Sequence, residues 1–199
     1  MPMPELTPPR LVVGISGASG AIYGVRLLEL LAETPVQTHL VVTRSARITL
    51  RHEVGLTLAD LADRADVVHP DTDVGATIAS GSFRTMGMVV APCSIKSMSA
   101  IATGVTSTLL ARAADVVLKE RRRLVLMVRE TPLHRNHLRT MTELAELGAI
   151  IAPPVPAFYT SPQTLDDIVN HTVGRVLDLF EVETGAVSRW TGLRDHAHR

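Results

Sequence analysis

The chain has 199 residues, of which 46% are hydrophobic and 20% are charged, and its formal net charge is zero. This size and composition can bury one core, so we expect a single domain over residues 1–199. Zero net charge argues against nucleic acid or an anionic membrane as the main partner. The single cysteine excludes a disulfide framework and a thiolate metal cluster.

The two ends of the chain carry no targeting signal that we can identify. Residues 1–10 are polar and rich in proline, which predicts a flexible extension rather than an apolar leader. No later apolar run approaches the length of a membrane span, and residues 181–199 read as a tail after the last helix. The sequence therefore predicts a soluble, cytoplasmic protein.

Apolar runs and helical spacing alternate along the chain. The runs predict strands at 11–15, 36–43, 88–91, 124–128 and 149–152. The spacing predicts helices at 21–31, from 46 onward, at 94–102, 107–119, around 138–147 and at 165–180. We expect Pro92 to end the third strand. This alternation is typical of an α/β protein with a doubly wound, mainly parallel sheet, a Rossmann-like or flavodoxin-like three-layer sandwich.

The first turn, 14–20, reads Gly-Ile-Ser-Gly-Ala-Ser-Gly and joins a strand directly to a helix. Glycines allow a ligand to approach backbone amides there, and a helix amino end favours an anion. The spacing is not that of a dinucleotide fingerprint, and the second strand ends in Thr43-Arg44-Ser45 without a carboxylate for a ribose. NAD is therefore disfavoured and FMN fits better, although a plain strand-to-helix turn explains the same letters.

A second turn of the same kind follows the third strand, at Ala-Pro-Cys-Ser-Ile-Lys-Ser (91–97). Ser94 can cap the next helix, and Ser97 presents a hydroxyl one turn later. Two such helix starts at neighbouring strand ends suit a phosphorylated flavin. We expect Cys93 to be a small buried hydrophobe rather than a nucleophile.

The strand at 124–128 is apolar throughout and runs into Arg129, Glu130, Thr131 and Pro132. A strand that is apolar on both faces lies inside a parallel sheet, and ligands collect at the carboxyl ends of such strands. The charged pair is therefore a candidate edge of an active site. The alternative is a solvated loop after a core strand.

Aromatic residues are only 3% of the chain, so the pair in Pro-Pro-Val-Pro-Ala-Phe-Tyr (153–159) is informative. The prolines predict a stiff extended loop that holds Tyr159 toward a polar partner. Trp190, in the tail, either anchors the tail by burial or covers a flat or cationic ligand. His134 and His137 lack a nearby carboxylate, so we expect surface residues there and no metal site.

Several motifs, in one order from about Leu11 to Trp190, resemble the UbiX family of flavin prenyltransferases, including the UbiX-like subunits that accompany hydroxyarylic acid decarboxylases. The motifs are GISGASGAIYGVRLL, APCSIKS, RAADVVLKERR, VRETPLH, PPVPAFY and GRVLD. The resemblance implies a metal-independent transferase that moves a dimethylallyl group from dimethylallyl monophosphate to N5 and C6 of reduced FMN. Prenylated FMN would serve UbiD-type decarboxylases, and a homo-oligomer, a dodecamer, is expected.

The resemblance also implies roles for particular residues. Positions that match FMN contacts are Gly17, Ala18, Ser19, Thr43, Ser94, Ile95, Lys96, Ser97 and Arg129. Positions that match the site of the prenyl phosphate are Lys119, Arg129, Glu130, Tyr159 and Arg175. Positions that match catalytic groups are Ser19, Glu53, Glu130 and Trp190.

The chemistry of an allylic phosphate agrees with these roles. Its leaving dianion needs cations, and the developing allylic cation needs a flat, electron-rich shield such as the flavin or Trp190. Glu130 would orient Arg129 or pass a proton through the phosphate. Ser19 and Glu53 match proton-handling positions, so the route of the proton stays open among Glu130, Glu53, Ser19 and the phosphate.

The chain departs from the family pattern at two positions, and two other functions remain. Val105 follows Gly104 where the family usually has Asp, and Thr43 replaces a serine but keeps a hydroxyl. The alternatives are a flavin-dependent decarboxylase of the cysteine-decarboxylase type and a non-catalytic flavin-binding partner of a decarboxylase. A cysteine decarboxylase of that type would have a His-centred active site after the second strand. The corresponding region of this chain has Glu53 directly after His52, which counts against that alternative.

Overall fold

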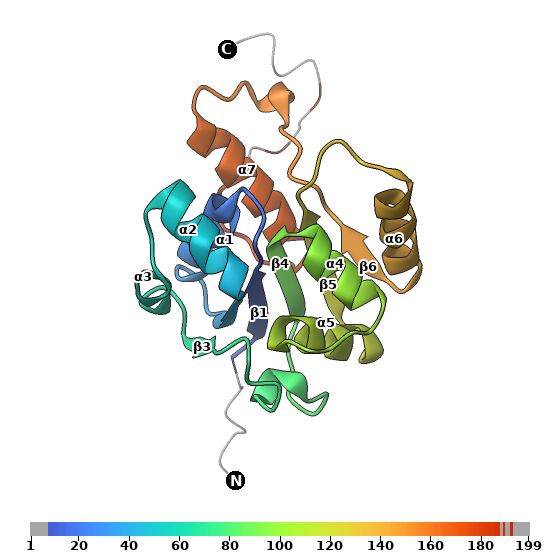
Figure 1. Ribbon diagram of the computed structural model, residues 1–199. Coiled ribbons are helices and arrows are strands. Elements are labelled where there is room, and N and C mark those ends of the chain that lie inside the picture. The colour runs from blue at the N-terminus through green and yellow to red at the C-terminus, as the bar shows by residue number, and fades with distance from the viewer. Residues whose placement is uncertain (1–7, 188, 190–191, 193–199) are drawn as a thin grey trace.

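The computed structural model describes residues 8–187, 189 and 192, and within them the chain forms a six-stranded sheet in which every neighbouring pair is parallel (Figure 1). The strands are β1 (Arg10–Ile15), β2 (Gln37–Val42), β3 (Val67–His69), β4 (Gly87–Cys93), β5 (Arg123–Val128) and β6 (Ala149–Ile151). Their spatial order is β3-β2-β1-β4-β5-β6. The predicted doubly wound parallel sheet is confirmed, and the strand order is that of the Rossmann fold.

Helices cover both faces of the sheet and complete three layers (Figure 1). One face carries α1 (Ala21–Leu31), α2 (Arg44–Val54), α3 (Leu58–Ala62) and α7 (Leu165–Asp178). The other face carries α4 (Ile95–Ala102), α5 (Leu109–Lys119) and α6 (Arg135–Glu146). Two short 3-10 turns lie at Thr77–Ala79 and Phe158–Thr160. None of the described helices is long and apolar enough to cross a membrane.

Side chains of the central strands alternate between the two faces and build two separate cores. In β1, Leu11, Val13 and Ile15 pack under α1 and α7, whereas Val12 packs on the opposite side with α4 and α5. Strands β4 and β5 follow the same period of two. Both faces of these strands are covered, which is why the sequence shows continuous apolar runs there instead of alternation.

The structure differs from the sequence prediction at several element ends and in two short elements. Strand β4 does not end at Pro92: the ladder becomes irregular after Val90, and Cys93 then pairs with Val128. An irregular ladder tolerates a proline because its missing amide is not required for pairing. The short elements β3 and α3 were not predicted, and α7 ends at Asp178 rather than at Phe180.

Helix α1 lies very close to the ends of β1 and β4. A Cβ atom on Gly24 would lie 2.5 Å from the carbonyl oxygen of Ala91 and 2.7 Å from Cδ1 of Ile15. The backbone oxygen cannot move without moving the strand. Gly24 therefore sets how closely α1 approaches the carboxyl edge of the sheet.

We expect Gly24→Ala to lower the free energy of unfolding by about 1–3 kcal/mol, because overpacking outweighs the gain of about 1 kcal/mol in helix propensity. Urea denaturation measures the change. Gly75→Ala is the control, since a Cβ there would meet its nearest neighbour, Oδ1 of Asp73, at 3.6 Å. Equal stability of the Gly24 and Gly75 variants would contradict the close approach of α1.

A pair of histidines, one buried and one half-buried, joins β2 to β3. Nδ1 of His39 lies 3.0 Å from Nε2 of His69, and the two rings are stacked. His39 is 4% exposed. Burial, followed by the nearby charges of His69 and Arg10, lowers the pKa of His39 from 6.5 to about 4, although Asp66 acts in the opposite direction.

This lowered pKa predicts acid sensitivity. The unfolded chain binds a proton at His39 near its ordinary pKa, so the stabilisation is present above pH 6.5 and is lost as the pH falls toward 4. The shift corresponds to about 3 kcal/mol at full loss. In urea denaturation at stepwise pH, we expect His39→Leu to flatten the slope between pH 6.5 and 4. An unchanged slope would show that other groups cause the acid sensitivity.

Candidate active site

A cavity of about 800 Å³ opens at the carboxyl edge of the sheet, between α1 and the start of α7. Its walls come from the first turn, α1, the end of α2, the end of β5, the proline loop and the first turns of α7. Ile22, Val54, Val128 and Val155 make much of the lining apolar. Tyr23 is the one aromatic residue among the described residues that line this cavity.

A smaller cavity of about 280 Å³ adjoins it and is lined by polar groups of both predicted turns. Its lining residues are Gly17, Ala18, Ser19, Ser45, Ser94, Ile95, Lys96, Arg129 and Glu130. Ser19, Arg129 and Glu130 line the larger cavity as well, so they lie at the junction of the two. The structure thus brings most of the predicted FMN-contacting positions to one place.

Glu53 occupies the amino end of α1. Its Oε2 accepts hydrogen bonds from the amides of Gly20 at 2.8 Å and Ala21 at 3.0 Å. Burial raises the pKa of Glu53, but these amides, the Ser19 hydroxyl and the charge of Arg129 outweigh burial and hold the pKa below its ordinary value. Glu53 is therefore an ionised carboxylate. It occupies the amino end of α1, where the sequence analysis expected an anionic group of the ligand.

Gly17 is required by a neighbouring helix. A Cβ atom at Gly17 would lie 2.3 Å from Cβ of Ser45, which is in the first turn of α2. Thr43 caps that helix by accepting the amide of Ala46 at 3.2 Å. Thr43 does not line either cavity, whereas Ser45 lines the smaller one. Of these two residues after β2, Ser45 is therefore the one that lines a cavity, and the resemblance did not single it out.

The start of α4 follows the sequence prediction closely. Ser94 is the residue before the helix, and its Oγ accepts the amide of Ser97 at 3.3 Å and donates to Oγ of Ser97 at 3.2 Å. Ser97 is buried and does not line the cavities. Cys93 is buried, and burial raises the pKa of its thiol to about 12, which agrees with its predicted role as a small hydrophobe.

Arg129 and Glu130 face the cavities rather than forming only a solvated loop. The amide of Arg129 donates to the carbonyl of Cys93 at 3.0 Å and so ties the end of β5 to the end of β4. Burial raises the pKa of Tyr23, and the positive charge of Arg129 partly offsets that rise. The same charge helps to lower the pKa of Glu53. The guanidinium is therefore close enough to act electrostatically on both sides of the junction.

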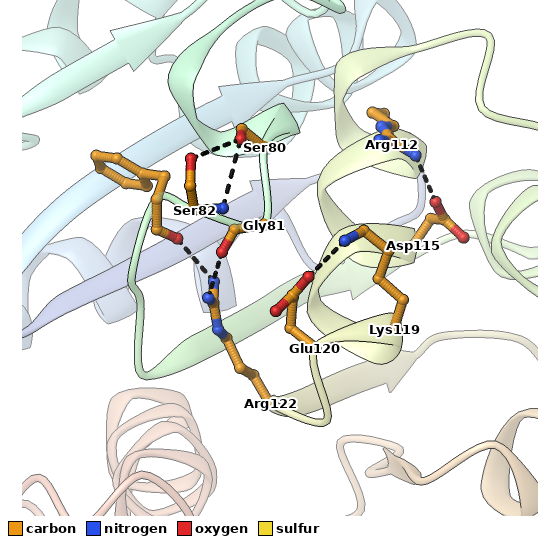
Figure 2. A network of polar contacts seen from close by, with 9 residues as sticks. Ser80, Gly81, Ser82, Arg112, Asp115, Lys119, Glu120 and Arg122 are labelled. Atoms are coloured by element: carbon orange, nitrogen blue, oxygen red, sulfur yellow. Dashed lines mark hydrogen bonds and ion pairs between the residues drawn. The ribbon is translucent and has the colours of Figure 1, made fainter.

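Within a single chain, the structure does not bring Lys119 to Arg129, so their joint role in a phosphate clamp stays a prediction. Lys119 ends α5 and forms an ion pair with Glu120, beside the loop that contains Gly81 (Figure 2). Helix α5 returns the chain to the amino end of β5, whereas Arg129 follows its carboxyl end. The six residues of β5 span about 20 Å.

Tyr159 and Arg175 do meet, in a third cavity of about 330 Å³. This cavity shares Pro153 and Val155 with the large cavity. His171, which the sequence analysis did not single out, lies between them: its Nε2 is 3.4 Å from the Tyr159 hydroxyl oxygen. Burial and then the charge of Arg175 lower the pKa of His171, although Asp178 opposes this, so the imidazole stays neutral.

Two further expectations concern Trp190 and metals. Trp190 lies outside the described residues. Within residues 8–187, 189 and 192, no group of three or more His, Cys, Asp or Glu side chains is placed to hold a metal ion. The described groups offer hydroxyls, amides, cations and an apolar wall, which suit a phosphorylated, flat, largely apolar ligand.

Comparisons with known proteins agree with this geometry. The family model described as Flavoprotein matches residues 3–177. The flavin prenyltransferase UbiX of Escherichia coli K12 is 59% identical over 186 residues, which are 92% of this chain and 98% of that protein.

Two solved structures superpose closely. The crystal structure of AnUbiX (PadA1) in complex with FMN and dimethylallyl pyrophosphate gives a TM-score of 0.92 at 46% identity, covering 94% of this chain and 99% of that one. A dodecameric, FMN-dependent UbiX-like decarboxylase from Escherichia coli O157:H7 gives 0.90 at 50% identity, covering 92% and 100%. The chain therefore belongs to the flavoprotein family and, within it, to the UbiX flavin prenyltransferases.

Proposed function

We propose that this chain transfers the dimethylallyl group of dimethylallyl monophosphate to N5 and C6 of reduced FMN, giving prenylated FMN. The observation that carries the proposal is the junction at which Ser19, Arg129 and Glu130 line a small polar cavity and a large apolar cavity at once. A phosphate fits the first, and a flat ring with a prenyl chain fits the second. The relative solved with FMN and dimethylallyl pyrophosphate supports the pairing of ligands.

The smaller cavity is the proposed site of the FMN phosphate. Gly17 and Ala18 line it from the first turn, and Ser94 and Lys96 line it from the start of α4. Amides at a helix amino end and a lysine suit a phosphate dianion. Reduced FMN, when bound, supplies the nucleophilic N5 that receives the allylic carbon.

The junction is the proposed site of bond cleavage in the donor. Arg129 offers a fixed cation to the leaving phosphate, and Glu130 next to it orients that cation or carries a proton to the phosphate. Tyr159 and Arg175 approach from the adjoining third cavity. Ile22, Val54 and Val155 give the larger cavity an apolar wall, which would shield an allylic cation from water once the ligands fill the cavity.

Glu53 is the proposed acceptor of the proton that leaves during ring closure. Its lowered pKa means that it is ionised at neutral pH, so it can take up a proton but has none to give. Ser19 donates a hydrogen bond to it and lines both cavities, so the hydroxyl can pass the proton from the ligand to the carboxylate.

A homo-oligomer, a dodecamer by analogy with the solved relative, completes the proposal. Lys119 lies at the opposite edge of the sheet from Arg129, so a role for this residue at the donor phosphate requires Lys119 of the partner subunit. We further propose that the protein acts in the cytoplasm and that a UbiD-type decarboxylase receives the product.

The direct test is anaerobic incubation of the protein with reduced FMN and dimethylallyl monophosphate, followed by mass spectrometry of the flavin. We expect a flavin heavier by one five-carbon prenyl unit. Dimethylallyl pyrophosphate is tested in parallel, because that donor is bound in the solved relative. FMN binding with unchanged mass with both donors would identify a non-catalytic flavin carrier. Oxidation of a cysteinyl peptide without a donor would identify a cysteine decarboxylase.

Glu130→Gln separates the donor site from the flavin site. We expect the rate of prenyl transfer to fall about 10²-fold, since one charged group at the phosphate is lost, while FMN stays bound. Stopped-flow absorbance and flavin fluorescence measure the rate and the affinity. Glu146→Gln, at an exposed position at the end of α6, is the control. Loss of FMN from the Glu130 variant would refute the placement of Glu130 at the donor phosphate.

A further inference from the structure

Ser16 is a fully buried polar residue between β1 and the glycine turn, and no role in the proposed reaction has been given to it so far. Its Oγ donates to the carbonyl of Pro92 at 2.9 Å and accepts the amide of Ser94 at 2.7 Å. The Ser16 amide donates to the same Pro92 carbonyl at 3.2 Å. The hydroxyl thus uses both its donor and its acceptor capacity across the gap between β1 and β4.

These bonds join the two turns that line the smaller cavity. Ser16 precedes Gly17 and Ala18 of the first turn, and Ser94 begins the second turn at the start of α4. The regular pairing of β1 with β4 ends at Gly14 and Val90. Beyond it, the backbone bond from the Ser16 amide to the Pro92 carbonyl and the two bonds of the Ser16 hydroxyl join the strand ends. Within the described part of the chain, the Ser94 amide has Ser16 Oγ as its partner.

Removal of the hydroxyl has a specific consequence at the start of α4. The Pro92 carbonyl keeps the Ser16 amide, but the Ser94 amide loses its partner. The Ser94 amide is half-buried, and a donor that is shielded from water without a partner is costly, so the first residues of α4 would shift toward water or toward another acceptor. That shift would move Ser94, Ile95 and Lys96 relative to Gly17 and Ala18, which line the other side of the cavity.

We propose that Ser16 is a positioning residue for the flavin phosphate: its buried hydroxyl fixes the start of α4 against the glycine turn at the width that a phosphate needs. Ser16 does not line either cavity, so it acts through Ser94 rather than by contact with the ligand. This inference rests on the proposed binding of FMN in the two adjoining cavities. The affinity for the flavin phosphate then depends on the Ser16 hydroxyl, which lies outside the smaller cavity.

The test compares FMN with riboflavin, which lacks the phosphate, by fluorescence titration of Ser16→Ala. We expect the Kd for FMN to rise about tenfold and the Kd for riboflavin to change by less than about twofold. A role in general stability alone would weaken both ligands alike. Titrations are made well below the unfolding midpoint, with folding checked by circular dichroism.

Thr38→Val is the matched control. Thr38 is 2% exposed, and its Oγ1 also makes two hydrogen bonds, donating to Asp66 Oδ2 at 2.9 Å and accepting the Asp66 amide at 3.0 Å. It lies at the amino end of β2, away from the cavities. We expect this variant to lose stability while keeping the wild-type Kd for FMN.

The outcomes separate this inference from the proposed function. If the wild type does not bind FMN, the proposed function fails. If the wild type binds FMN and Ser16→Ala binds it equally well, or loses FMN and riboflavin in the same proportion, the positioning role of Ser16 is overturned. Should Ser16→Ala not fold, Ser16→Cys, with a thiol that is a weaker donor and acceptor, carries the same comparison.

Discussion

The site depends on the direction in which the chain leaves two neighbouring strands. After β1 the chain passes to α1 on one face of the sheet, and after β4 it passes to α4 on the other face. The two connections therefore diverge at the carboxyl edge of the sheet and leave a crevice between them. Because all the strands are parallel, the carboxyl end of every strand lies at that same edge. Both adjoining cavities lie there, and Ser16 holds the crevice at a fixed width.

The balance of charge in the crevice limits how an anion can bind. Glu53 fills the amino end of α1, so this helix end is satisfied from within the chain. Two carboxylates, Glu53 and Glu130, line the larger cavity together with one guanidinium, that of Arg129. A phosphate dianion added there needs more positive charge than Arg129 supplies. Lys96 and Arg175 line the two flanking cavities and are further sources of positive charge.

The sequence predicted the helices and strands around the crevice, because apolar runs, helical spacing and capping residues each involve only a few neighbouring residues. Helix α1 begins at Ala21 and ends at Leu31 as predicted, and Thr43 and Ser94 cap the helices that follow them. Strand β3 has three half-buried residues, too few for a periodic signal. The bond between Glu53 and the Gly20 amide joins residues 33 apart, and the Ser16–Ser94 bond joins residues 78 apart. Such contacts exist only once the sheet has formed.

Lys119 shows what a sequence motif leaves open about the assembly of a site. A motif match assigns a residue to a chemistry, but it does not say which copy of the chain supplies it. In a parallel sheet, a helix that follows one strand must return to the amino edge before the next strand begins. Lys119 lies four residues before Arg123, the first residue of β5, and Arg129 directly follows the last. The strand direction alone therefore places these two cations at opposite edges, so a clamp that contains both must be built from two chains.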